Sequence, residues 1–152
     1  MKTFVFAFAV LVFLPFQSVQ AASPEEQARF LAAVRQAYDK QDTNALFALV
    51  CWDRVTRKDA DSARKQFERI LSGTKVADMV LVDPDPKLPK HEWTDKDGVS
   101  YRPNLPLIKQ LKITYGPGAL FHRGLLPVGE KDGRLYLSEP APVENRSTAK
   151  TP

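Results

Sequence analysis

The chain has 152 residues, 43% of them hydrophobic and 26% charged, and a formal net charge of +4 at pH 7. This composition is typical of a globular domain, and the weak, scattered positive charge argues against a nucleic-acid-binding surface. The single cysteine, Cys51, excludes an intramolecular disulfide, and its place in the apolar stretch 45–52 favours a buried side chain over a reactive thiol or an intersubunit bridge.

Residues 1–21 have the pattern of a secretory signal peptide. Lys2 supplies a positive charge, residues 4–16 are apolar, and the sequence before the predicted cleavage after Ala21 ends in small residues. The apolar stretch is shorter than the ~20 residues that cross a bilayer as a helix, which favours cleavage over a retained anchor and argues against stable membrane insertion. We therefore expect an exported protein, periplasmic or secreted, with one domain at 22–139 and a disordered polar tail at 140–152.

Three helices are expected in the N-terminal half of the mature chain. The first spans 24–40, where Ser23 and Glu26 have the spacing of a capping box. The second begins at residue 42 or 43 and runs to Trp52, and its apolar residues cover most of its circumference. The third follows a cap at Thr56 and ends before Gly73; its charged face indicates solvation, with a binding patch as the alternative.

A first strand is expected over residues 76–82, which are apolar at both parities apart from Asp78. We expect Asp78 to face solvent, and a buried cation beside it is the alternative. Alternating prolines then indicate a loop over residues 83–90, and Asp97-Gly98 predicts the turn of a short hairpin within 92–101.

An antiparallel meander is expected after this hairpin. Residues 107–115 alternate with a period of two, which predicts a half-buried strand whose outer face carries Ile108 as its large apolar residue. A second extended run covers 119–128, and Lys131-Asp132-Gly133 predicts a turn into a third strand at 135–137. One face of such a sheet is apolar, so the preceding helices must cover it.

Three helices before about four antiparallel strands resemble the cystatin-like and NTF2-like (SnoaL-like) cone superfamily, an α+β fold. The segments that carry the resemblance are the helical pair 30–38 and 46–52, the helix 67–71 and the strands within 107–115 and 125–137. Residues 125–137 also resemble the C-terminal hairpin of uncharacterised exported bacterial proteins. The resemblance implies three helices packed on a curved antiparallel sheet that encloses a pocket.

Four aromatic residues are candidates for lining such a pocket: Tyr38, Trp52, Tyr115 and Phe121. Aromatic side chains on converging helix and sheet faces suit apolar ligands, and the alternative is that they fill the core. His122 shares parity with Leu120 and Leu126 and is a weak catalytic candidate as an acid or base, against the alternative of a surface or core histidine.

The sequence favours a non-enzymatic exported domain that binds a small apolar ligand or a protein partner. Its two histidines lack the spacing of a zinc protease, and phosphate-binding, nucleophile-elbow and Cys-x-x-Cys motifs are absent, so we expect neither metal nor cofactor. The alternative is a small isomerase or lyase that uses His122 with Tyr115 or Asp78 to move protons. A homodimer through the outer face of the sheet, supported by Ile108, is a further possibility.

Overall fold

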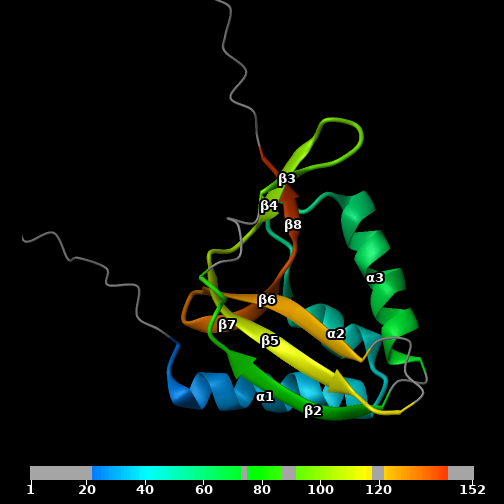
Figure 1. The fold of residues 1–152 in the computed structure, drawn as a ribbon, viewed down its shortest axis with the longest axis vertical. Helices are drawn as coiled ribbons and strands as arrows, with labels where there is room; N and C mark the ends of the chain where they lie inside the picture. The colour runs from blue at the N-terminus through cyan, green and yellow to red at the C-terminus, as the bar shows by residue number, and fades with distance from the viewer. Residues whose placement is uncertain (1–21, 73–74, 87–91, 118–121, 144–152) are drawn as a thin grey trace, which may run out of the picture.

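The computed structural model describes residues 22–72, 75–86, 92–117 and 122–143, which form three helices, a five-stranded sheet and a three-stranded sheet (Figure 1). The expectation of a mixed helix and sheet fold is confirmed. The helices are α1 (Pro24–Asp39), α2 (Thr43–Ala48) and α3 (Arg57–Leu71). The larger sheet has the order β1-β7-β6-β5-β2, with β1 (Val50–Cys51), β2 (Val76–Val82), β5 (Leu107–Tyr115), β6 (Arg123–Lys131) and β7 (Arg134–Ser138). The smaller sheet has the order β3-β4-β8, with β3 (Trp93–Thr94), β4 (Ser100–Pro103) and β8 (Pro140–Pro142).

Helix α1 begins as predicted, but its capping box is only half formed. The Ser23 hydroxyl accepts a hydrogen bond from the Glu26 backbone N–H at 3.2 Å. The Glu26 carboxylate does not return to Ser23; it accepts the backbone N–H of Leu135 at 2.9 Å and pairs with Arg29. Strand β1 pairs only with Leu137 and Ser138 of β7, so its ladder does not extend to Leu135. The Glu26 carboxylate accepts the Leu135 N–H in place of a carbonyl from a neighbouring strand.

Helix α2 is shorter than predicted, because it ends at Ala48 and the chain then forms strand β1. Strand β1 runs parallel to β7, with Val50 opposite Leu137, and the Leu137 N–H donates to the Leu49 carbonyl at 2.9 Å. The apolar residues that suggested a helix buried on all sides are instead divided between a helix and a buried strand. The periodicity of a short apolar run does not distinguish a helix from a strand.

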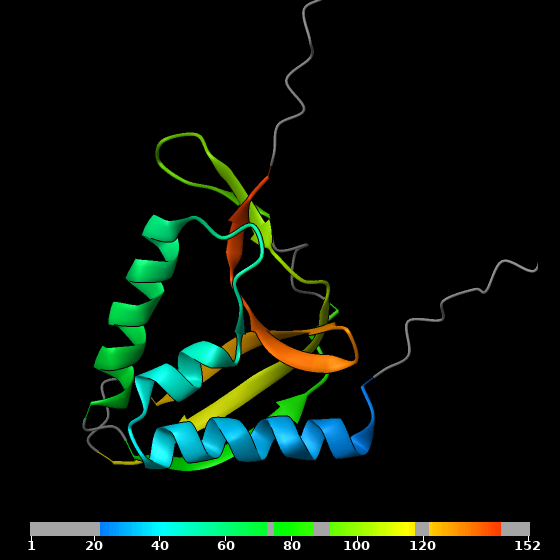
Figure 2. The ribbon, with the colours of Figure 1, turned by 180° about the vertical axis from the view of Figure 1, so that it is seen from behind.

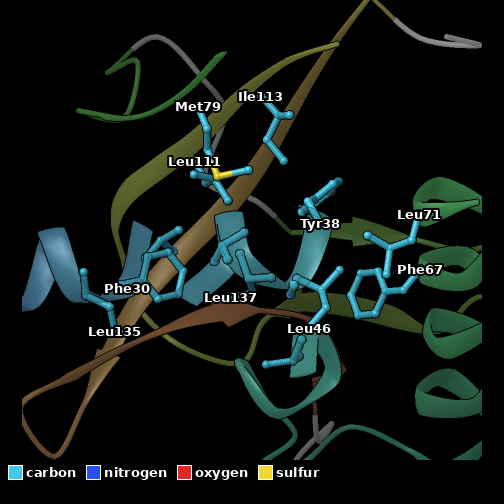
Figure 3. Close-up of a cluster of buried hydrophobic side chains, with 14 of the residues drawn as sticks. Phe30, Tyr38, Leu46, Phe67, Leu71, Met79, Leu111, Ile113, Leu135 and Leu137 are labelled. Atoms are coloured by element: carbon cyan, nitrogen blue, oxygen red, sulfur yellow. The ribbon is translucent and has the colours of Figure 1, made fainter. Parts of the chain in front are cut away.

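The hydrophobic core lies between the helices and one face of the five-stranded sheet (Figure 2). Side chains of all three helices meet those of β2, β5 and β7 in this core (Figure 3): Phe30, Tyr38, Leu46, Phe67, Leu71, Met79, Leu111, Ile113, Leu135 and Leu137. Val34, Leu46, Leu111, Ile113 and Val128 are completely inaccessible to solvent. The interior of the sheet's helix-covered face is therefore filled by side chains.

The meander is confirmed, but one residue of β5 faces the other way. Two residues of β5 oppose one of β6 between the pairs Leu107 with Gly129 and Lys109 with Val128, which is a β-bulge. Ile108 packs against the core, so its predicted place on the outer face is wrong. The bulge changes the parity of the strand at that point, and the support that Ile108 gave to a dimer through the outer face is lost.

The prediction of a disordered tail from residue 140 is wrong for residues 140–143, which are ordered. Residues 140–142 form β8, which pairs with β4, and the Val143 N–H donates to the Ser100 carbonyl at 2.8 Å. Ala141 is 2% exposed. Prolines at 140 and 142 suggested an irregular tail, but an edge strand tolerates proline because one of its sides needs no ladder hydrogen bonds. Residues 144–152 lie outside the described residues, as do residues 1–21.

Strand β6 runs over residues 123–131, which is later than the expected run at 119–128, and residues 119–121 and part of the expected loop at 83–90 lie outside the described residues. Other expected elements agree with the structure. Helix α3 follows an N-cap at Thr56, β2 covers residues 76–82, and β3 pairs with β4 around Gly98, whose φ is 81°. Asp78 is exposed, as predicted from the sequence. Within the described ranges, no helix has the length and apolar character to span a membrane.

Candidate functional site: two clefts at the junction of the sheets

The two sheets are joined where β7 continues into β8 and where β4 continues toward β5 (Figure 1). Asn104 lies at this junction, and each of its polar groups is hydrogen-bonded. Its backbone N–H donates to the Glu139 carbonyl at 2.9 Å, and its own carbonyl accepts from the Arg54 guanidinium at 2.7 Å. Its side-chain amide donates to the carbonyls of Cys51 and Asp53, at 2.6 and 3.1 Å. The position of Glu139 is thereby fixed relative to both sheets.

Two clefts adjoin at Glu139. The first, which we call the acidic cleft, has a volume of about 310 Å³ and separates α3 from the three-stranded sheet. It is lined by Asp59, Ser62, Ala63, Gln66, Trp93, Asp95, Tyr101, Glu139 and Pro140. The second, which we call the apolar cleft, has a volume of about 190 Å³ and lies between the two sheets. It is lined by Trp93, Pro103, Gln110, Leu125, Pro127, Ser138, Glu139 and Pro140.

Trp93 lies on the edge strand β3 and contributes to both clefts. It is opposite Tyr101 in the β3–β4 ladder, and the two rings are stacked with centroids 5.9 Å apart and planes at 18°. The Trp93 side chain is nevertheless 45% exposed, and Leu125 in the apolar cleft is 57% exposed. Large apolar side chains that are exposed next to each other in a hollow with a polar rim commonly mark interaction sites.

The electrostatics of the acidic cleft favour positive charge. Burial raises the pKa of the Glu139 carboxyl to about 7. The pKa of the Tyr101 hydroxyl is also raised, first by burial and then by the negative charges of Asp59, Asp95 and Asp97. Among the described residues that line this cleft, three are acidic and none is basic. The cleft therefore presents an aromatic pair within a negative electrostatic potential.

A third hollow lies on the other side of the junction, with a volume of about 440 Å³. Its polar lining residues are Arg54, Glu92, Arg102 and Asn104. Arg54 adopts a left-handed backbone conformation with φ 62°, and its guanidinium is held by the Asn104 carbonyl. This hydrogen bond gives Arg54 a structural role in the junction.

Three of the four predicted pocket residues, Tyr38, Trp52 and Tyr115, are described by the structure, and none of these three lines the acidic or the apolar cleft. Tyr38 is 4% exposed in the core, where its hydroxyl lies 3.5 Å from that of Tyr115, and burial raises the pKa of Tyr38. Trp52 stacks on Phe47 at a centroid distance of 4.1 Å, and its indole N–H donates to the Phe47 carbonyl at 3.0 Å. The structure thus brings Tyr38 and Tyr115 together and separates Trp52 from the clefts.

The other two predicted candidates also lie away from the clefts or outside the description. His122 is exposed next to the start of β6, and its backbone carbonyl accepts the Tyr115 N–H at 3.1 Å. Phe121 lies outside the described residues. His122 is therefore accessible to solvent, with no lining role in either cleft.

Sequence reasoning did not single out Trp93, Leu125 or Glu139. Trp93 carried a usable signal, since a tryptophan in a short hairpin that is mostly polar has little core to enter. Glu139 had no comparable signal, because it lies at the predicted boundary between domain and tail. Its environment results from the pairing of β8 with β4, which joins residues about 40 positions apart in the sequence.

Within the described part of the chain, no group of three or more His, Cys, Asp or Glu side chains is arranged to hold a metal ion. Comparisons of the chain with protein-family models, curated proteins and solved structures found no match. The chemistry of the two clefts therefore carries the functional inference.

Proposed function

We propose that the protein is an exported, non-enzymatic binding domain that holds its partner or ligand in the acidic and apolar clefts. The observation that carries this proposal is the exposure of Trp93 and Leu125 in adjoining clefts, since a monomer has no packing reason to leave both side chains open to water. The signal-like pattern of residues 1–21 supports export.

We also propose a relationship to the cystatin-like and NTF2-like cone superfamily, supported by the order of helices before an antiparallel meander. The interior of the five-stranded sheet offers little room for a ligand, because Val34, Leu46 and Ile113 are fully buried there. The additional three-stranded sheet supplies the hollow surface, so we propose that binding takes place beside it rather than inside the cone.

Site-specific photo-crosslinking tests this proposal. A photoreactive amino acid replaces Leu125 in cells that produce and export the protein, and a second version carries it at Val80, which is 36% exposed on the edge strand β2 of the larger sheet. We expect a discrete adduct from position 125 that is lost when Trp93→Ala is added, and no matching adduct from position 80. Equal adducts at both positions, or an adduct that is insensitive to Trp93→Ala, would contradict a binding site in the clefts.

A second candidate function is supported by Glu139. A carboxyl with a pKa of about 7 exchanges protons at neutral pH, and Tyr101 lines the same cleft. An isomerase or lyase would then use Glu139, and not the exposed His122, as its proton donor or acceptor. The test identifies a small molecule from the mass of the photo-crosslinked adduct and then supplies that compound intact to the purified protein. Its conversion by the wild-type protein and not by Glu139→Gln would favour the enzyme, and its unchanged recovery would favour the binding domain.

A further inference from the structure

The two adjoining clefts differ in chemical character, and this difference restricts the partner. Resting on the proposed function, we infer that the clefts bind a peptide segment of a partner protein in which a lysine or arginine is next to an apolar residue. The basic side chain occupies the acidic cleft against Trp93, and the apolar side chain occupies the apolar cleft against Leu125.

The acidic side chains come from three separate elements and converge on one cleft. Asp59 belongs to the first turn of α3, Asp95 to the β3–β4 turn and Glu139 to the link between β7 and β8. Thr56 donates to the Asp59 carboxylate at 2.7 Å, and the backbone N–H groups of Asp97 and Val99 donate to Asp95 at 2.9 and 2.8 Å. These local hydrogen bonds fix the carboxylates of Asp59 and Asp95 in position without supplying a positive charge.

None of the three carboxylates takes part in an ion pair with a basic side chain of the described residues. The ion pairs found there join Arg29 with Glu26, Lys109 with Asp83, and Lys131 with Asp53. A lysine or arginine of a partner would therefore supply the first counter-charge in the acidic cleft. Charge complementarity also disfavours nucleic acid and acidic peptides as occupants.

The aromatic pair adds a second reason to favour a cation. One face of Trp93 is stacked on Tyr101, while nearly half of the side chain remains accessible to solvent. A lysine or arginine bound against an aromatic face is stabilised by the ring's electron density, most strongly for tryptophan. The protein contains such a contact elsewhere, since the Arg64 guanidinium lies 4.1 Å from the Phe47 ring centroid.

The apolar cleft explains why the partner should be a peptide segment and not an isolated cation. Leu125 and three prolines at positions 103, 127 and 140 form its apolar lining. Trp93, Glu139 and Pro140 line both clefts, so a short segment with two neighbouring side chains can occupy both at once. An isolated amine would leave Leu125 exposed.

The test is an NMR titration of the purified protein with blocked dipeptides at about pH 8, where Glu139 is ionised. The probes are N-acetyl-lysyl-leucine amide, its neutral norleucyl analogue, its acidic glutamyl analogue, and butylamine. The indole N–H signals of Trp93 and Trp52 are followed together. Trp52 provides an internal control, because its indole N–H is hydrogen-bonded to the Phe47 carbonyl and it lines neither cleft. The lysyl peptide should shift the Trp93 signal saturably and bind about tenfold more tightly than the norleucyl peptide.

Charge variants locate the effect. Asp59→Asn and Glu139→Gln should each weaken binding of the lysyl peptide by roughly threefold or more, through loss of a facing charge. Asp61→Asn is the matched control, because Asp61 is an exposed residue of the same helix that does not line the cleft. Its affinity should equal that of the wild type. Equal weakening in all three variants would overturn the assignment of the basic side chain to the acidic cleft.

The remaining outcomes separate this inference from the proposed function. Binding of the norleucyl or glutamyl peptide at Trp93 as tightly as the lysyl peptide would overturn the preference for a basic residue and leave the binding site in place. Butylamine binding as tightly as the lysyl peptide would overturn the peptide segment in favour of a small amine. Absence of any Trp93 shift would overturn the inference. The proposed function would be overturned as well only if photo-crosslinking at position 125 also gave no adduct that depends on Trp93.

Discussion

The hydroxyl of Ser138 donates a hydrogen bond to the side-chain carbonyl of Asn104 at 2.9 Å, and both residues are only 3% exposed. The same Asn104 oxygen accepts the Glu139 N–H at 3.1 Å, and the Leu105 N–H donates to the Ser138 hydroxyl at 3.2 Å. This buried network ties the end of β7 to the chain between β4 and β5. The two clefts depend on it because Glu139 forms part of both.

Replacement of Asn104 by alanine should destabilise the protein strongly. Four side-chain hydrogen bonds are lost, and the buried partners at Cys51 and Ser138 are left unsatisfied, which should lower the free energy of unfolding by about 3–5 kcal/mol. Urea denaturation of Asn104→Ala measures this loss. Asn44→Ala is the matched control, since Asn44 is exposed and its side chain accepts a hydrogen bond from the half-buried Arg64; a loss as large as that of Asn104→Ala would contradict the role of the buried network.

Glu139 should make stability depend on pH. Burial raises its pKa from 4.5 to about 7, so between these values the folded state binds more protons than the unfolded state. The contribution of the protonated carboxyl is fully present below pH 4.5 and is lost as pH rises to about 7. The size of this loss is of the order of 1–3 kcal/mol after allowance for partial exposure.

The neutral variant Glu139→Gln isolates this effect from the other titrating groups. The wild type should lose about 1–3 kcal/mol of unfolding free energy between about pH 4 and pH 8 through Glu139, and Glu139→Gln should not. The unfolding free energy of the variant minus that of the wild type should therefore rise by this amount over the range. Thermal or urea unfolding of both proteins across this range gives the difference directly. A difference that does not change with pH would show that the Glu139 carboxyl titrates as it does in water.

Gly129 is required by the close approach of the chain between β4 and β5. A Cβ atom at this position would meet the Leu105 Cβ and would lie 2.8 Å from the Pro106 carbonyl oxygen. Backbone atoms cannot move aside as a flexible side chain can, so Gly129→Ala should cost about 1–3 kcal/mol. Gly124→Ala is the control, because its Cβ would lie 3.1 Å from the terminal hydroxyl of Tyr115, which can shift. Equal effects on the unfolding midpoint would refute this distinction.

The Glu26 carboxylate should stabilise the uncovered edge of β7. Glu26→Ala leaves the Leu135 N–H without its acceptor in a buried position, with an expected loss of about 1–3 kcal/mol. Glu25→Ala removes the same charge from an exposed position in the same first turn and should cost much less. Hydrogen exchange at Leu135 adds a local measurement, and unchanged protection in Glu26→Ala would contradict the contact.

The parts of the fold that were predictable have strong local patterns. The caps at Ser23 and Thr56, the turn at Gly98 and the strand at residues 107–115 depend on nearby residues, and the structure contains each of them, although the bulge near Ile108 interrupts the alternation of that strand. Strand β1 and strand β8 were not predicted, because each exists through pairing with a strand that is distant in the sequence. Local propensity does not encode such partners.

The candidate site was the least predictable part for the same reason. Tyr38 and Tyr115 were correctly placed on converging faces of helix and sheet, and their hydroxyls lie 3.5 Å apart. The acidic cleft, however, is formed by α3, the β3–β4 hairpin and the β7–β8 link, and the apolar cleft lies between β5 and β6 of one sheet and the other sheet. The relative positions of these elements depend on the Asn104 network. The sequence alone does not show whether an asparagine in a loop is buried or exposed.

The pairing of β1 with β7 also has a consequence for the order in which the chain can fold. Val50 lies next to Leu137, so the strand that follows the first two helices finds its neighbour only near the end of the described chain. During synthesis from the N-terminus, the helices can form early, but this edge of the sheet stays open until residues 134–138 have been made. The apolar residues that β7 covers stay exposed until then, and only the final strands complete the fold.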